Sequence, residues 1–207
     1  MSERFSEAFE IIVGHEGGLS MDRFDRGNWT GGAQGKGQLR GTKFGISAMS
    51  YPTLDIANLT LDDARRIYRA NYWNAAGCPD LPDPLALVVF DTAVNSGVGR
   101  ARQFLAQTRD WREYLDVRLR FMQGIATWSR YGRGWTKRVT TLRQQAAAWE
   151  EEARVQASIP ALPPRAEGEG VFPLEGCPGF SRVRVMKRTD GSGLKFYAVP
   201  DGKEVVQ

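Results

Sequence analysis

The stretch Pro84-Leu85-Ala86-Leu87-Val88-Val89-Phe90-Asp91-Thr92-Ala93-Val94 is apolar around nearly its whole circumference when it is drawn as a helix. A helix that is hydrophobic on all sides is usually buried, because it has no polar face to present to water. Pro79, Pro82 and Pro84 mark a turn before it. We therefore expect residues 84–94 to form the buried central helix of a mainly helical fold.

Further helices are expected on both sides of this stretch. Residues 2–15 place Phe5, Phe9 and Ile12 on one face, and Gly17-Gly18 follows as a stop signal. The other expected helices are residues 60–72, 98–107, 110–128 and 135–157. Residues 19–45 instead hold many Gly, Asp, Arg and Asn and predict a long loop or short irregular strands. A loop of this length inside a compact domain is usually functional.

The composition changes after Ala157. Residues 158–170 are rich in Pro, Ala, Glu and Gly and predict a linker. Residues 182–187 alternate between polar and apolar side chains, and residues 194–199 are mostly apolar. A turn lies between the two stretches, which indicates a β-hairpin. We expect a domain over residues 1–157, whose C-terminal part is 98–157, then the linker, then a small hairpin tail over 171–207.

Bulk properties exclude some classes of protein. The chain has 207 residues, 42% of them hydrophobic and 25% charged, which is a soluble globular composition. A net charge of +4 and a pI near 9.2 suit anionic partners without choosing among them. The single histidine excludes a multi-histidine metal site, and Cys78 and Cys177 are expected to be free thiols. No signal peptide and no membrane-spanning run is recognisable, so we expect synthesis in the cytoplasm and no stable membrane insertion.

Two carboxylates stand out near the end of the first expected helix. Glu16 would face the negative end of the helix dipole, which raises the pKa of a carboxyl group. A raised pKa is what a general acid for glycosidic bonds needs. Asp25 lies nine residues later, and an acid with a second carboxylate is the minimal equipment for glycoside hydrolysis. The alternatives are an exposed surface glutamate and a turn aspartate that makes local backbone bonds.

Other candidate site residues are less specific. Thr42 begins Thr42-Lys43-Phe44-Gly45-Ile46-Ser47, a short strand and turn whose hydroxyl could hold a water. Tyr72, Trp73 and Asn95 mix aromatic rings with an amide, as sugar sites do. The alternative for these three is core aromatics and a helix-end polar group. The glycines of residues 31–37 do not make a phosphate-binding loop, because no Gly-Lys-Ser/Thr follows.

The order of these segments resembles the glycoside hydrolase family 108 N-acetylmuramidases, which are endolysin-type lysozymes of phages, prophages and some bacterial secretion loci. The segments that carry the resemblance are Glu16-Gly17-Gly18, Asp22, Asp25, Thr42–Ser47, Tyr72-Trp73, Phe90–Gly97 and Gly134–Val139. The resemblance covers residues 5–145 and is most specific over 5–97. It implies a mainly α, lysozyme-like α+β fold. It also implies that Glu16 is the catalytic acid and that Asp25 and Thr42 position the attacking water.

The chain departs from the family pattern in two places. Residues 26–40 look like an insertion, so that Thr42 comes later than usual. The C-terminal helical part, 98–157, is shortened in comparison with the region that many members carry as a peptidoglycan-binding segment, and the tail 171–207 has no counterpart that we recognise.

The leading hypothesis is hydrolysis of the β-1,4 bond between N-acetylmuramic acid and N-acetylglucosamine, for cell-wall degradation and host lysis. Glu16, Asp25 and Thr42 would be catalytic, and Tyr72, Trp73 and Asn95 would bind peptidoglycan. We expect no metal, no cofactor, no nucleic-acid partner and a monomer that reaches the wall through a holin or a similar route. The alternatives are a lytic transglycosylase acting on the same bond and a non-catalytic wall-binding protein of a phage particle.

Overall fold

The computed structural model describes residues 3–14, 18–158, 170–173, 178–187 and 194–200. The chain divides into two compact units, Met1–Ala147 and Ala148–Gln207. Residues 159–169 of the expected linker lie outside the described residues, and the expected domain boundary stays a prediction. Among the described helices, none is long and apolar enough to cross a membrane.

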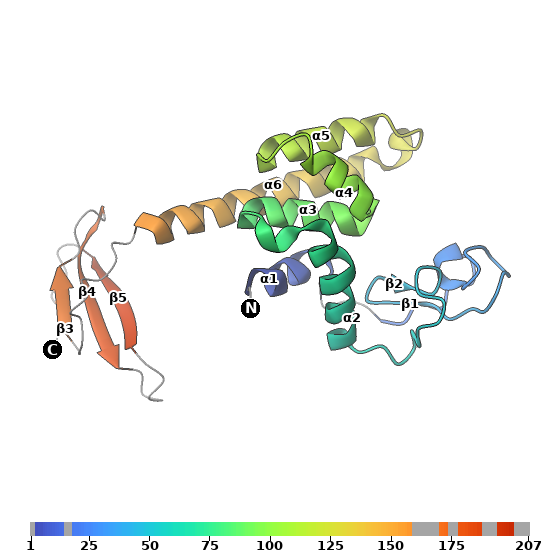
Figure 1. Cartoon of the computed structure of the whole chain (residues 1–207), viewed down its shortest axis with the longest axis horizontal. Coiled ribbons are helices and arrows are strands. Elements are labelled where there is room, and N and C mark those ends of the chain that lie inside the picture. The colour runs from blue at the N-terminus through green and yellow to red at the C-terminus, as the bar shows by residue number, and fades with distance from the viewer. Residues whose placement is uncertain (1–2, 15–17, 159–169, 174–177, 188–193, 201–207) are drawn as a thin grey trace. The chain divides into compact units, whose positions relative to one another are not determined.

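The first unit is organised around helix α3 (Asp83–Ser96), in which every residue from Pro84 to Ala93 is buried. This confirms the central helix expected from its apolar circumference. Helix α3 contacts α1 (Glu3–Ile12), α4 (Val98–Leu105), α5 (Trp111–Gln123) and a π-helical turn, η2 (Arg69–Asn74). Figure 1 shows these elements gathered around α3.

An aromatic cluster fills the contact between α1, η2 and α3. The Trp73 ring lies with its centroid 5.6 Å from that of Phe5 and 5.4 Å from that of Phe90. Tyr68, the last residue of α2 (Leu61–Tyr68), packs edge-on against Phe9. Helix α2 begins at a capping box in which the Thr60 hydroxyl accepts from the backbone N–H of Asp63.

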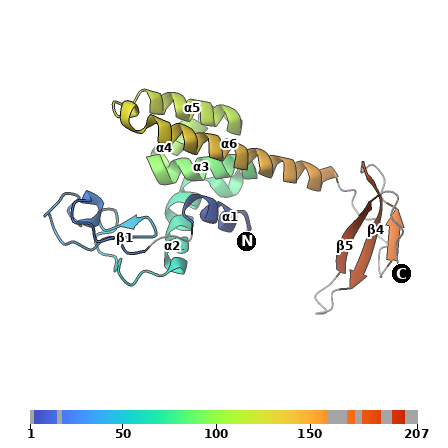
Figure 2. The same cartoon turned by 180° about the vertical axis from the view of Figure 1, so that it is seen from behind.

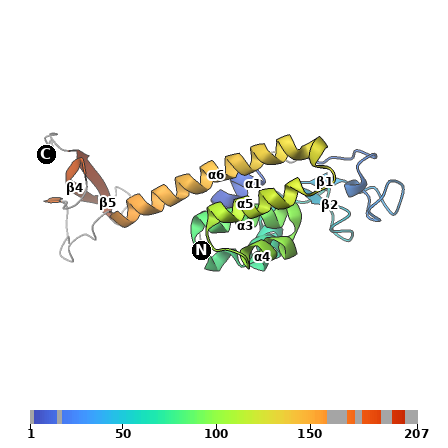
Figure 3. The same ribbon diagram turned by 90° about the horizontal axis from the view of Figure 1, so that it is seen from above.

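Helices α5 and α6 (Trp128–Ser158) run side by side (Figures 2 and 3), and the Arg143 guanidinium of α6 lies 2.5 Å from the Asp116 carboxylate of α5. Two expected boundaries were wrong. Helix α5 ends at Gln123 and not at 128, with Gly124 as its C-cap. Helix α6 begins at Trp128 and not at 135. Gly132 lies inside this helix and does not end it. The Trp128 indole covers this glycine so closely that a Cβ there would lie 2.6 Å from the ring, which explains why the position has no side chain.

Between α1 and α2 the chain forms a lobe with little regular structure. It contains a 3-10 turn, η1 (Arg26–Asn28), and the antiparallel pair β1 (Thr42–Lys43) and β2 (Ile46–Ser47). A second 3-10 turn, η3 (Cys78–Asp80), precedes α3. A helical body with one small β element is the mainly α, lysozyme-like class that the sequence predicts, and this prediction is confirmed.

The second unit contains an antiparallel sheet in the order β3-β4-β5, formed by Gly170–Pro173, Phe180–Lys187 and Leu194–Pro200. The pair β4–β5 is the expected hairpin. Val183 and Val185 are buried at alternate positions of β4, as the two-residue period of a strand requires. Strand β3 was not predicted, because four residues ending in proline give no alternating pattern to detect.

Candidate active site

The end of α1 differs from the sequence-based expectation. The helix ends at Ile12, and the N–H groups of Val13 and Gly14 both bond to the Phe9 carbonyl. Gly14 has a φ of 71°, the left-handed conformation that commonly ends helices. The helix expected over residues 2–15 therefore stops earlier, at Gly14 and not at Gly17-Gly18. Glu16 lies outside the described residues, so its role as catalytic acid stays a prediction.

Asp25 caps the short helix η1 at the surface. Its Oδ1 atom accepts from the Gly27 backbone N–H at 2.8 Å, and Asp22 makes a similar local bond to the Phe24 N–H at 2.9 Å. These are the local backbone bonds expected of a turn aspartate, the alternative to a catalytic role. They use one oxygen of the exposed Asp25 carboxylate. Within the described part of the chain, the other oxygen has no partner and is free to bind a water.

Asn28 closes the base of the inserted loop. Its carbonyl accepts from the backbone N–H groups of Arg40 at 2.9 Å and Gly41 at 3.1 Å, and its buried Nδ2 donates to the Asp22 carbonyl at 2.8 Å. The loop therefore leaves and returns at one point. Asp25 precedes Asn28 by three residues and Thr42 directly follows Gly41. The insertion consequently does not separate the Asp25 segment from the Thr42 segment in space.

Thr42 lies at the centre of the small lobe, between two extended segments. Its backbone pairs with Ser20 on one side, through bonds of 2.8 and 3.0 Å, and with Ser47 of β2 on the other. Its Oγ1 atom is buried and has no hydrogen-bond partner among the described residues. Buried hydroxyl groups nearly always find a partner. This one is therefore suited to hold a water or a substrate group.

Tyr68 anchors the hairpin that carries Thr42. The two-residue turn is Phe44-Gly45, whose φ values of 51° and 73° match a type I′ turn. The Tyr68 hydroxyl donates to the Phe44 carbonyl at 3.1 Å. Burial raises the pKa of Tyr68 to about 12, so that it stays a donor at neutral pH. The sequence predicts a helix over residues 60–72, which contains Tyr68, but it carries no signal for this bond.

The three expected sugar-binding residues have different surroundings. Trp73 is 3% exposed and packs between Phe5 and Phe90, so its ring belongs to the core and offers no face to a sugar. Asn95 is exposed, and its Nδ2 donates to the Asp91 carbonyl of its own helix at 2.8 Å. Tyr72 is half-buried and stacks on Tyr68 with ring centroids 5.2 Å apart. Of the three, Tyr72 is the one that stacks on Tyr68, the residue that holds the β1–β2 hairpin.

A cavity of about 460 Å³ opens in the same lobe, and Thr42 itself is not among its lining residues. Its lining residues combine apolar and polar side chains: Leu19, Met21, Leu39, Arg40, Thr53, Asp55, Ile56 and Ala57. Leu19 and Met21 flank Ser20, the residue that pairs with Thr42, and both crowd the place where a Cβ on Gly41 would lie. Such a mixed lining suits an N-acetylated sugar, which has an apolar methyl group beside hydroxyl and amide groups. These residues could not be predicted as a set from the sequence, since they are scattered over three loops.

Comparison with known proteins identifies the family of this segment. Residues 9–97 match the family model described as glycosyl hydrolase 108. Residues 9–97 belong to that family. Among solved structures, that of Brucella abortus SagA is similar, with 27% sequence identity and a TM-score of 0.55 over 70% of this chain and 94% of that chain. No curated protein matches the chain.

The glycosyl hydrolase 108 segment contains all six candidate site residues, from Glu16 to Asn95. This segment makes the chain a glycoside hydrolase, and the glycosyl hydrolase 108 family of the matched segment indicates peptidoglycan as the substrate. Groups of three or more His, Cys, Asp or Glu side chains that could hold a metal ion do not occur in the described part of the chain.

Two arginines from outside the glycosyl hydrolase 108 segment are bound to its last helix. Asp91 of α3 is buried, and Arg118 of α5, fully buried itself, donates from Nη1 to Asp91 Oδ2 at 2.5 Å. Arg138 of α6 donates from Nε and Nη2 to Asp91 Oδ1 at 2.9 and 2.5 Å. This cluster joins the segments around residues 91 and 138: one supplies the carboxylate and the other a guanidinium.

Proposed function

We propose that the chain is an N-acetylmuramidase that hydrolyses the β-1,4 bond between N-acetylmuramic acid and N-acetylglucosamine. The observation that carries the proposal is the glycosyl hydrolase 108 segment, which contains Glu16, Asp25 and Thr42 in their expected order. The closure of the inserted loop at Asn28 supports it, because Asp25 and Thr42 then belong to one small lobe.

In this proposal Glu16 donates a proton to the glycosidic oxygen as the bond breaks. Asp25 and Thr42 hold the water that adds to the sugar from the other side. The free oxygen of the Asp25 carboxylate and the unpartnered Oγ1 atom of Thr42 are acceptors that a water can use. The proton that the water loses on attack goes to Asp25.

Digestion of purified peptidoglycan tests the proposal. Glu16→Gln should lower the rate of release of reducing sugar by about 10²-fold or more, since general acid catalysis contributes that much. Glu7→Gln is the matched control, because Glu7 lies on the surface in an ion pair with Arg4 and should not affect the rate. Equal rates for wild type and Glu16→Gln would overturn the assignment of Glu16.

The mass of the fragments tests the chemistry. Hydrolysis leaves a muramic acid with a free reducing end. A lytic transglycosylase would leave an anhydro-sugar lighter by one water. We expect the hydrated product, because the lobe that carries Asp25 and Thr42 has two acceptors suited to hold a water. Anhydro-muramic acid as the main product would favour the transglycosylase.

We further propose that the activity serves host lysis and that the protein reaches the wall only after the membrane is breached. Bacteria that express the wild-type chain should keep their culture density until chloroform permeabilises the membrane, and should then clear. Cells that express Glu16→Gln should not clear. Clearing without permeabilisation would contradict the proposed route.

A further inference from the structure

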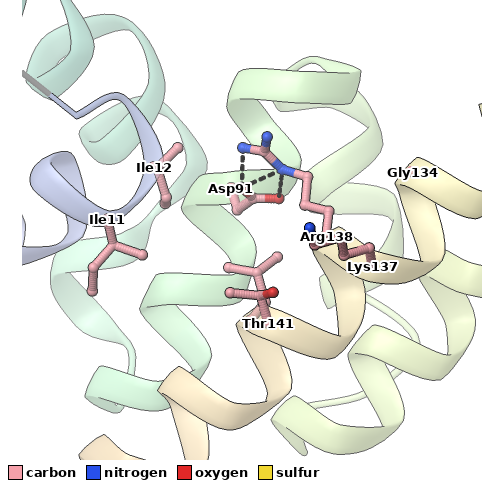
Figure 4. Close-up of a pocket in the computed structure, with 8 residues that line it drawn as sticks. Ile11, Ile12, Asp91, Gly134, Lys137, Arg138 and Thr141 are labelled. Carbon is pink, nitrogen blue, oxygen red and sulfur yellow. Dashed lines mark hydrogen bonds and ion pairs between the residues drawn. The ribbon is translucent and has the colours of Figure 1, made fainter. Parts of the chain in front are cut away.

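A second cavity, of about 300 Å³, lies where the end of α1 meets α3 and α6 (Figure 4). Ile11, Ile12 and Leu142 give it apolar walls. Its polar lining consists of Asp91 from α3 and of Lys137, Arg138 and Thr141 from α6. None of these side chains belongs to the proposed catalytic residues.

The charges of the described residues around this cavity do not balance. Asp91 is the one carboxylate among the described lining residues, and it already binds two guanidinium groups, those of Arg118 and Arg138. Lys137 adds a third positive charge, and no ion pair of Lys137 occurs among the described residues. Arg118 does not line the cavity, and its Nε and Nη2 atoms have no hydrogen-bond partner among the described residues. A concave surface with this excess of positive charge concentrates anions.

We propose that this cavity binds a carboxylate of the peptide attached to muramic acid in peptidoglycan. The inference rests on the proposed function, which supplies the substrate class. Peptidoglycan peptides carry carboxylates next to the methyl groups of alanine, whereas hydroxyl groups of the glycan carry no charge. The Lys137 ammonium and the Thr141 hydroxyl donate to the carboxylate. Ile11, Ile12 and Leu142 contact the methyl group.

A pair of soluble probes tests the charge requirement. The first is N-acetylmuramyl-L-alanyl-D-glutamate, and the second is the same compound with both glutamyl carboxyl groups amidated. Calorimetric titration at low salt should show that the wild type binds the acid about two- to fivefold more tightly than the amide, the range expected for a partly exposed charge pair. Salt should reduce this preference through screening.

Two variants on one face of α6 test whether the preference for the acid comes from the cavity. Lys137→Met should abolish the preference for the acid. Arg133→Met, which removes the same charge from an exposed position of α6 outside the cavity, should keep it. The inference is overturned if the wild type binds neither probe, if it binds both equally, or if the two variants behave alike.

Hydrolysis of intact peptidoglycan is measured in parallel so that the two proposals can fail separately. Cleavage without a preference for the acidic probe would reject only the peptide site. A preference for the acidic probe without cleavage would reject the muramidase and leave a wall-binding protein.

Discussion

Asp91 and Arg138 lie 47 positions apart in sequence and form a two-point ion pair, with Arg138 Nε 2.9 Å and Nη2 2.5 Å from Asp91 Oδ1. Arg118 binds the other carboxylate oxygen, Oδ2. One buried carboxylate thereby joins α3, α5 and α6. Helix α3 is the last helix of the glycosyl hydrolase 108 segment, and it is bound by arginines from outside that segment. The stability of the segment is therefore coupled to that of α5 and α6.

The first prediction concerns this carboxylate. Asp91→Asn leaves the buried Arg118 without a counter-charge, which costs about 3–5 kcal/mol of unfolding free energy when one partner of a buried pair is removed. Asp116→Asn is the matched control, because its ion pair with Arg143 lies at the surface and contributes under about 1 kcal/mol. Urea unfolding measures both. Similar losses in the two variants would show that the Asp91 cluster is not a buried charge network.

The second prediction separates function from stability at Thr42. Thr42→Val removes a buried hydroxyl that bonds to nothing in the described protein, so the free energy of unfolding should stay within about 1 kcal/mol of wild type or rise. If the hydroxyl positions the attacking water, the rate of wall hydrolysis should fall by about 10²-fold. Thr42→Ser keeps the hydroxyl and should retain most of the rate.

Thr92→Val is the converse control for Thr42. The Thr92 hydroxyl is also buried, but it donates to the Val88 carbonyl at 2.8 Å. Its loss should cost about 1 kcal/mol of stability and leave the hydrolysis rate unchanged. A Thr42→Val protein that loses stability and keeps its activity would identify the hydroxyl as structural.

The third prediction tests whether Tyr68 holds the Phe44-Gly45 turn in place. Gly35 and Gly45 both have a φ of 73°, where alanine is strained by about 1–2 kcal/mol. A Cβ on Gly35 meets nothing within 4 Å, whereas one on Gly45 lies 2.5 Å from the buried Tyr68 hydroxyl. Gly45→Ala should therefore lose about 1–3 kcal/mol more than Gly35→Ala and should also slow hydrolysis, because the clash moves the turn next to Thr42. Equal thermal stability of the two variants would rule out a rigid anchor.

The sequence predicts those helices whose burial shows in their residue pattern, and it does not predict features that depend on a particular side-chain contact. Helix α3 could be predicted because its burial is total and therefore shows in every residue from Pro84 to Ala93. The start of α6 could not, since Gly132 in a helix is explained only by the indole of Trp128 lying over it. That contact arises from side-chain packing, which helix propensities do not contain.

The candidate site divides in the same way. Resemblance to the family predicted Asp25 and Thr42 as partners, but nothing local showed that an insertion between them closes on the Asn28 carbonyl. Trp73 and Tyr72 are neighbours in sequence, yet one is core and the other is half-buried, because the π-helical turn sets which ring faces inward. Alternation of polar and aromatic residues does not encode that rotation.

The fourth prediction concerns Cys78, whose thiol is buried in η3. Burial in apolar surroundings disfavours the thiolate and raises the pKa of Cys78 to about 12, against about 8.5 for an exposed thiol. Since the thiolate is the reactive form, Cys78 of the native protein should resist iodoacetamide at pH 8. The measurement uses Cys177→Ser, so that Cys78 is the one remaining thiol. Labelling should become fast only in urea that unfolds the chain.

The same pKa shift predicts a pH dependence of stability. Because the Cys78 thiol loses its proton at lower pH in the unfolded state than in the native state, the free energy of unfolding should fall as the pH rises from about 8.5 toward 12. Rapid labelling without urea would show that η3 opens readily and that the turn before α3 is not part of the rigid core.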